Sequence, residues 1–142
     1  MKIMVLNGPN LNMLGIREPG IYGKVSYADL IRKLKDYAAT RGIELDCRQT
    51  NHEGILVDWI QEAYGQFDGI VINPGAYTHT SIAILDAVKA VHIPTVEVHI
   101  SDVDAREPFR QRSYISLACV RTIKGMGLEG YVEAIKTLCP ES

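Results

Sequence analysis

The feature that most limits how this chain can fold is a series of short, continuous runs of apolar residues. Stretches with helical periodicity separate these runs. Three runs are rich in β-branched residues and bounded by turn residues: Ile3 to Leu6, Gly69 to Ile72 and Thr95 to Ile100. Runs of this kind are typical of parallel strands buried on both faces, because such strands have no solvent-facing side. We expect two weaker strands at Ile43 to Gln49 and Ser116 to Lys124.

Helices are expected between and after these strands. The clearest shows helical spacing of apolar residues from Tyr27 to Ala38, with Ser26 suited to cap its start and Gly42 to end it. The others are expected at Ile55 to Ala63, Ser81 to Val91 and Gly130 to Leu138. This alternation predicts a single α/β domain over residues 1–142, with a flavodoxin-like, doubly wound sheet of about five parallel strands.

Composition and simple motifs exclude several classes of protein. The 142 residues carry a formal net charge of -2, which gives no overall field to attract nucleic acid or an anionic membrane. The first apolar run stops at Asn7, too early for a signal peptide or a membrane span, so we expect a cytoplasmic protein. The sequence has no Walker A loop, G-x-S-x-G elbow, H-E-x-x-H motif or clustered Cys/His ligands, which argues against NTPase, serine hydrolase and zinc chemistry.

One dinucleotide-binding pattern, G-x-G-x-x-G, occurs at Gly125 to Gly130. Only twelve residues follow Gly130, too few for the next strand and its ribose-binding acid. We therefore interpret these glycines as close-packing positions.

Polar residues follow three of the expected strands. Ligands of open parallel sheets bind beyond the carboxyl ends of the strands. Those ends read Asn7 to Asn10, Asn73 to His79, and Glu97, His99 and Ser101, which predicts that they converge on one site.

The segment from Gly8 to Lys24 is long, rich in glycine and proline, and without apolar periodicity. Such a segment is an active-site lid or a disordered excursion, and we favour the lid because it contains Arg17 and Tyr22. A tyrosine with an ordinary pKa of about 10 is a poor base, but a nearby guanidinium stabilises the phenolate. Tyr22 can equally be an ordinary surface tyrosine.

Two histidines are candidates for chemistry or binding. Glu97 and His99 lie two apart on a strand, so both point to the same face and the carboxylate can orient the imidazole of a general acid. A structural histidine is the alternative. His79 precedes a helix, where backbone donors and hydroxyls suit an anionic or hydroxylated ligand, while Thr80 or Ser81 can simply cap that helix.

Arginines cluster after the third polar strand end. Arg106, Arg110 and Arg112 suit planar oxygen groups such as carboxylates, although each can also be a solvated surface charge. Their place at the expected crevice favours ligand binding.

Taken together, five ordered motifs resemble the type II 3-dehydroquinate dehydratase family. They are Leu6 to Leu11, Arg17 to Pro19 with Tyr22 and Gly23, Asn73 to Ser81, Glu97 to Ser101, and Ala105 to Arg110. The resemblance implies a hydro-lyase of the shikimate pathway, and so of aromatic amino acid biosynthesis. It would convert 3-dehydroquinate to 3-dehydroshikimate and water by anti elimination through an enolate, with no cofactor, metal or Schiff base.

The same resemblance implies a role for each matched residue. Tyr22 would be the base, Arg17 would stabilise its phenolate, His99 would be the acid with Glu97 as its partner, and Asn10 would hold the water or the enolate oxygen. The substrate's hydroxyls and carboxylate would be bound by Asn73, His79, Arg110 and the backbone donors of Ile100 and Ser101, with Arg106 closing the lid. Asp86 would reach a neighbouring subunit's site in a dodecamer of trimers.

Two positions depart from the family pattern: Cys119 replaces an alanine and Arg121 a glycine. A buried arginine is costly without a partner, so these changes bear on packing or subunit contacts. Two other functions stay open from the residues: a non-catalytic flavodoxin-like module that binds a nucleotide or phosphate, and dehydration through a lysine imine, for which no lysine falls at the expected crevice.

Overall fold

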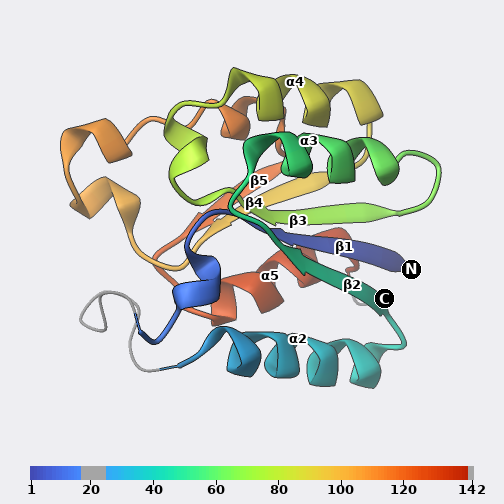
Figure 1. Ribbon diagram of the computed structural model, residues 1–142. Coiled ribbons are helices and arrows are strands. Elements are labelled where there is room, and N and C mark those ends of the chain that lie inside the picture. The colour runs from blue at the N-terminus through green and yellow to red at the C-terminus, as the bar shows by residue number, and fades with distance from the viewer. Residues whose placement is uncertain (17–24, 141–142) are drawn as a thin grey trace.

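The computed structural model describes residues 1–16 and 25–140 and contains one parallel sheet of five strands (Figure 1). The strand order is β2-β1-β3-β4-β5, and every neighbouring pair is parallel. This order is that of flavodoxin-like folds, as the sequence predicts. The strands are β1 (Lys2–Asn7), β2 (Glu44–Gln49), β3 (Gly69–Asn73), β4 (Thr95–His99) and β5 (Arg121–Lys124).

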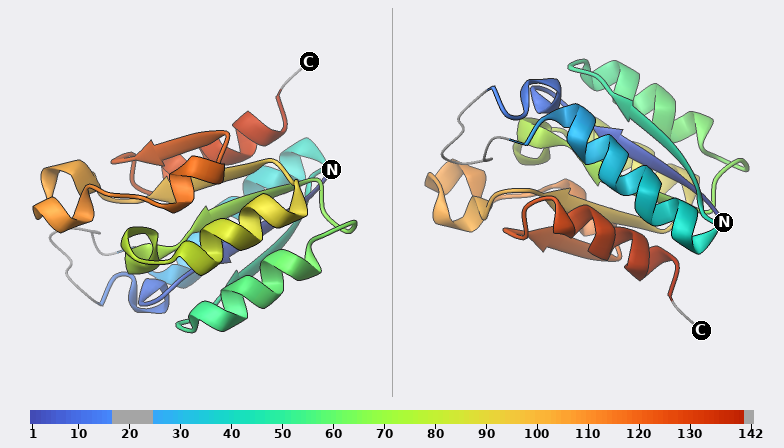
Figure 2. Two further views of the ribbon diagram at one scale, coloured as in Figure 1. Left: turned by 90° about the horizontal axis from the view of Figure 1, so that it is seen from above. Right: turned by 90° about the horizontal axis from the view of Figure 1, so that it is seen from below.

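Two helices cover each face of the sheet (Figures 1 and 2). Helices α2 (Tyr27–Arg41) and α5 (Glu129–Leu138) lie on one face, and α3 (Glu53–Glu62) and α4 (Ile82–Val91) lie on the other. Strand β1 shows why its apolar run is continuous: Ile3 and Val5 belong to the core under α2 and α5, whereas Met4 and Leu6 belong to the core under α3 and α4.

The predicted ends of the first helix are confirmed. The Ser26 hydroxyl accepts a hydrogen bond from the Asp29 backbone N–H at 3.1 Å, and the Asp29 carboxylate accepts one from the Ser26 N–H at 3.0 Å. This reciprocal pair satisfies two N–H groups that the first helical turn leaves open. Gly42 ends the helix in the left-handed conformation.

The strand expected at Ser116 to Lys124 is wrong in its first half. A 3₁₀ helix (Ile115–Ala118) stands there, and only Arg121–Lys124 form β5. Local bonds explain the difference, because the Ser116 hydroxyl donates to the Ser113 carbonyl at 2.9 Å and the chain turns back on itself. Arg121 is about half exposed and donates to Thr137 at 2.9 Å, so this departure from the family pattern buries no unpaired charge.

Strand β2 is added on one side of β1 and strands β3 to β5 on the other, so the strand order reverses between β1 and β3, which is where doubly wound folds bind their ligands. Asn7 and Asn73 are register partners at the carboxyl ends of these strands, and the Gly8 N–H donates to the Asn73 carbonyl at 2.8 Å. A Cβ atom on Gly8 would lie 2.6 Å from the Pro74 carbonyl oxygen. Glycine is required here because the two strand ends come so close.

The glycines of the G-x-G-x-x-G pattern have two different roles. Gly130 is a close-packing position, since a Cβ atom there would lie 3.3 Å from both Ile123 and Val98. For Gly127 the prediction is wrong: nothing lies near its missing side chain, and its φ of +60° is what favours glycine. The N–H groups of Gly125 and Gly127 donate to the carbonyls of Ser101 and Ile100, each at 3.1 Å, and so fix the backbone just beyond β4.

The first part of the predicted lid segment is anchored to the core. Leu11 lies in a short 3₁₀ helix (Leu11–Met13), and both Leu11 and Leu14 are buried against α2 and its neighbours. Residues 17–24, with Arg17 and Tyr22, lie outside the described residues, so the lid stays a prediction for them. No helix in the described part of the chain has the length and apolar character needed to cross a membrane.

Candidate active site

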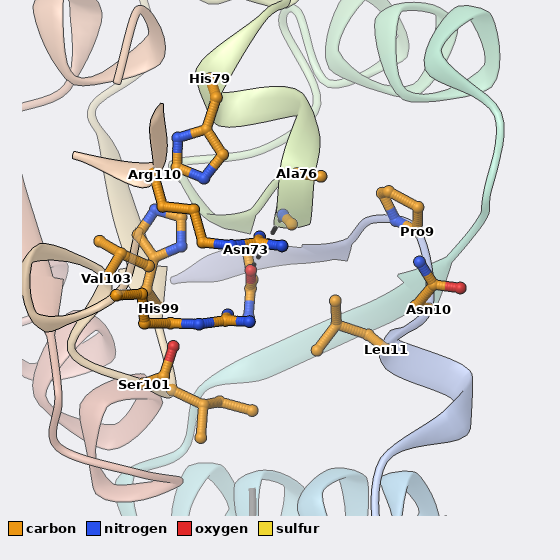
Figure 3. A pocket seen from close by; sticks show the side chains of 13 residues that line it. Pro9, Asn10, Leu11, Asn73, Ala76, His79, His99, Ser101, Val103 and Arg110 are labelled. Carbon is orange, nitrogen blue, oxygen red and sulfur yellow. Dashed lines mark hydrogen bonds between the residues drawn. The ribbon is translucent and has the colours of Figure 1, made fainter. Parts of the chain in front are cut away.

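Side chains from three strand ends meet in one pocket, as the sequence predicts (Figure 3). The rings of His79 and His99 lie on one side of it, and Pro9 and Asn10 lie across from them. Eight of the predicted site residues line this pocket: Asn10, Asn73, His79, His99, Ile100, Ser101, Arg106 and Arg110. The convergence follows from the parallel sheet, which brings all carboxyl ends to one edge.

The other predicted site residues lie elsewhere. Glu97 is behind His99 and touches the pocket only through it. Asp86 is exposed on α4 and does not line this pocket, which is consistent with a role toward another subunit but does not test it. Arg17 and Tyr22 are outside the described residues.

Glu97 and His99 form a buried hydrogen-bonded pair. Both side chains point to the same face of β4, as predicted, and His99 Nε2 bonds the Glu97 carboxylate at Oε2. The exposed fraction is 0% for Glu97 and 5% for His99. The carboxylate also accepts hydrogen bonds from the hydroxyls of Thr78 at 2.5 Å and Ser113 at 2.9 Å.

These contacts keep Glu97 ionised. Burial raises the pKa of Glu97, but the hydrogen bond and the charge of His99, with the hydroxyls of Thr78 and Ser113, lower it to below its ordinary value. A buried carboxylate on Nε2 orients the imidazole and stabilises its protonated form, which is what a general acid needs.

Asn73 is held in place by a second buried network. Its Oδ1 accepts from the Gly75 N–H at 3.1 Å (Figure 3), and its Nδ2 donates to the Tyr131 hydroxyl at 2.8 Å. Tyr131, wholly buried on α5, donates in turn to Asn7 Oδ1 at 2.6 Å. Burial raises the pKa of Tyr131, so the phenol stays neutral and serves as a donor.

His79 is oriented by the backbone of the segment after β4. Its Nδ1 lies 2.6 Å from the Arg112 carbonyl oxygen, which can only accept, so Nδ1 carries the proton. In the neutral ring Nε2 is then an acceptor. Ser81, not Thr80, caps α4 through a bond from the Ile84 N–H at 2.9 Å, so His79 lines the pocket and the next residues still begin the helix.

Two of the three clustered arginines reach the pocket. Arg106 and Arg110 line it, and Arg110 is positioned by an ion pair with Glu107 at 2.6 Å. Arg112 does not line it, because its guanidinium instead donates to the Tyr114 hydroxyl at 2.8 Å. Arg112 is exposed, so for this residue the alternative of a surface charge describes the structure.

Sequence reasoning missed Ser113, Thr78 and Tyr131 as parts of this site. Thr78 stands inside the motif that ends in His79, which is a local signal for it. Ser113 has no such signal, and Tyr131 is marked only by its agreement with the family pattern, because the two residues meet Glu97 and Asn73 through packing. Within residues 1–16 and 25–140, no group of three or more histidine, cysteine, aspartate or glutamate side chains is arranged to hold a metal ion.

The sequence profile of the family described as dehydroquinase class II matches residues 1–139. The chain belongs to this family. Among its relatives, the 3-dehydroquinate dehydratase of Variovorax paradoxus is 55% identical over 144 residues, covering 98% of this chain and 99% of its own. The 3-dehydroquinate dehydratase of Fusobacterium nucleatum is 57% identical over 138 residues, with 95% and 94% covered.

Solved structures of the family agree with the fold. The crystal structure of a type II dehydroquinase from Butyrivibrio crossotus has a TM-score of 0.96 and 54% identity, and covers 97% of each chain. A 3-dehydroquinate dehydratase-like protein from Bifidobacterium longum is more distant, with a TM-score of 0.73 and 30% identity over 97% of this chain and 94% of its own. The predicted family membership is thus confirmed.

Proposed function

We propose that this chain dehydrates 3-dehydroquinate to 3-dehydroshikimate in the shikimate pathway, and so serves aromatic amino acid biosynthesis. The observation that carries this function is the buried Glu97–His99 pair, in which the carboxylate of Glu97 supports His99 as the acid. His99 lines a pocket whose other polar groups suit the oxygen atoms of a substrate. The named relatives, similar over nearly the whole chain, support the same substrate.

The reaction is an anti elimination through an enolate. The Tyr22 phenolate, stabilised by Arg17, takes the proton beside the ketone, and the electron pair of that C–H bond forms the enolate. The ring nitrogen of His99 that Glu97 does not engage then protonates the departing hydroxyl, and its C–O bond breaks to release water. Asn10 holds the water or the enolate oxygen at the β1 end of the pocket. No cofactor or metal takes part in these steps.

The remaining pocket residues bind the ring. Asn73, fixed by Tyr131, and the acceptor Nε2 of His79 suit ring hydroxyls. Arg110 and the N–H groups of Ile100 and Ser101, on backbone held by the glycine turn, suit the carboxylate. Arg106 closes the segment 8–24 over the bound ring.

The working enzyme is a cytoplasmic dodecamer built of trimers. Asp86, exposed on α4, completes a neighbouring subunit's site. Exposed apolar side chains close to it support such an association surface, because water-facing patches of this kind are covered in assemblies. They are Ile82, one helical turn before Asp86 on α4, and Leu117 in the 3₁₀ helix (Ile115–Ala118) that packs against α4.

A spectrophotometric assay tests this function by following the conjugated enone product formed from 3-dehydroquinate, with chelator present. We expect full turnover, and turnover lost in a folded Tyr22→Phe variant that still binds much of the substrate. Near-normal turnover of that variant would refute the role of Tyr22. A wild-type protein without turnover would refute the function itself.

Two further measurements separate the rival functions. A nucleotide-binding module would copurify with flavin or nucleotide, whereas we expect a colourless protein. A lysine imine would make the enzyme lose activity on borohydride treatment with substrate. We expect no loss, because no lysine is among the described residues that line the pocket.

A further inference from the structure

The hydroxyl of Ser113 bonds the Glu97 carboxylate of the catalytic pair, and Ser113 does not line the substrate pocket. We propose that Ser113 is a positioning residue that sets how tightly the Glu97–His99 pair holds its proton. The inference rests on the proposed role of His99 as the acid, and adds to it a residue that does not contact the substrate.

Ser113 is placed so that its single hydroxyl proton points at the carboxylate. Its Oγ lies 2.9 Å from both Oε1 and Oε2 of Glu97, and 2.7 Å from the hydroxyl of Thr78. The Ser116 N–H donates to the same Oγ at 3.1 Å and so occupies its acceptor side. The Ser113 proton therefore goes to Glu97 directly, or to Thr78, which itself donates to Glu97 at 2.5 Å.

The Ser113 hydroxyl bonds the catalytic pair and none of the ring-binding groups. Ser113 lines a second cavity, which adjoins the substrate pocket because His79, His99 and Arg110 line both. Among the described residues, the Ser113 hydroxyl has hydrogen bonds only with Glu97, Thr78 and the Ser116 N–H. The Ser116 hydroxyl donates to the Ser113 carbonyl at 2.9 Å, so the residue is fixed from both ends. We therefore expect the loss of the Ser113 hydroxyl to act on turnover through the pair.

A hydroxyl that donates to a carboxylate stabilises its negative charge and weakens its attraction for a proton shared with a neighbour. Without Ser113, the carboxylate attracts the imidazole proton more strongly. The pair then loses its proton at higher pH. Because Ser113 is half-buried, we expect a shift of about half to one pH unit, which is what an ordinary hydrogen bond produces and less than a fully buried charge-assisted one.

In the described part of the chain, the other titratable and charged groups around Glu97 bond to partners other than Ser113. Burial, and then the charge of Glu97, raise the pKa of Cys119 to about 12, so this thiol stays neutral through the assay range. The remaining groups are the basic side chains of the second cavity, which bond to other partners: Lys124 to Asp104 at 2.6 Å, Arg110 to Glu107 at 2.6 Å, Arg112 to Tyr114 at 2.8 Å and His79 to the Arg112 carbonyl at 2.6 Å.

The test is the pH dependence of kcat and kcat/KM for 3-dehydroquinate in four variants and the wild type. Ser113→Ala removes the donor, and Ser113→Cys keeps the volume but weakens the donor. Ser113→Thr keeps the hydroxyl. Gln111→Ala is the matched control, because Gln111 lines the same cavity but its side chain donates to the Asp104 carbonyl and bonds neither Glu97 nor Ser113. Thermal unfolding of each variant shows which are folded at the assay temperature.

We expect the basic limb of the profile to move upward in Ser113→Ala and Ser113→Cys, with the acidic limb and KM unchanged. The Ser113→Thr and Gln111→Ala profiles should match the wild type. A folded Ala or Cys variant with an unmoved basic limb overturns the inference, and so does a Thr variant that shifts as far as Ala. A wild type without activity would instead refute the proposed function, and this inference with it.

Discussion

Replacing Glu97 by glutamine removes the charge behind the acid and leaves its shape. The carboxylate lies at hydrogen-bond distance from Nε2, and both side chains are buried, so solvent screens their interaction little. A hydrogen bond between two charged groups is worth about 1.5–3 kcal/mol. Each 1.4 kcal/mol is about a factor of ten, so we expect kcat at neutral pH to fall about 10- to 100-fold. KM should change little, because Glu97 does not line the ring-binding pocket.

The enone assay over a range of pH checks this expectation. Activity of Glu97→Gln should recover in part as the pH is lowered, because lower pH restores the proton on His99. Glu133→Gln is a matched control, since Glu133 pairs with Arg121 at the surface and does not line the pocket. A folded Glu97→Gln protein with wild-type kcat at neutral pH would show that the carboxylate does not support the acid.

Three further predictions follow from the buried contacts. Tyr131→Phe should lower the free energy of unfolding by about 1–3 kcal/mol, because it leaves buried amides unsatisfied. It should also raise KM more than it lowers kcat, because Asn73 loses the hydrogen bond that orients it. Denaturant unfolding measures the first effect and steady-state kinetics the second. Gly8→Ala should lower the free energy of unfolding by about 1–3 kcal/mol, because the added methyl group forces two strand ends apart. Gly54→Ala, with open space around it, should leave the free energy of unfolding unchanged or raise it by up to about 1 kcal/mol. The midpoints of urea unfolding compare the two variants. The pKa of Glu97 in the folded protein is below its ordinary value. The carboxylate therefore contributes its full stability above the ordinary glutamate pKa, and this contribution is lost as the pH falls through the folded value. Glu97→Gln should make the free energy of unfolding vary less with pH in the acid range, which urea titrations at several pH values measure.

The sequence predicted those parts of the fold that local pattern determines. The apolar run of β1 fills both halves of the core, and Ser26 and Gly42 end α2 through bonds within a few residues of each other. The start of β5 could not be predicted from local pattern. The bonds of Ser116 to Ser113 turn the chain before the strand begins, although residues 116–120 look suited to a strand.

The residues of the candidate site also fall into those that local sequence predicts and those that it does not. Asn10, Asn73 and His99 could be predicted because they follow strands directly, and a parallel sheet brings such positions together. Tyr131 reaches Asn73 across 58 residues of sequence, and Ser113 reaches Glu97 across 16. Contacts at such separations depend on how the helices and turns pack, which no local pattern contains.

A crystal structure with a stable analogue of 3-dehydroquinate bound would test most directly whether His99 is the acid of a dehydratase pocket at these strand ends. We expect the ring to lie among Asn10, Asn73 and Arg110, with the hydroxyl that leaves facing the nitrogen of His99 that Glu97 does not engage. A ring bound away from this pocket, or one whose leaving hydroxyl faces away from His99, would contradict the mechanism.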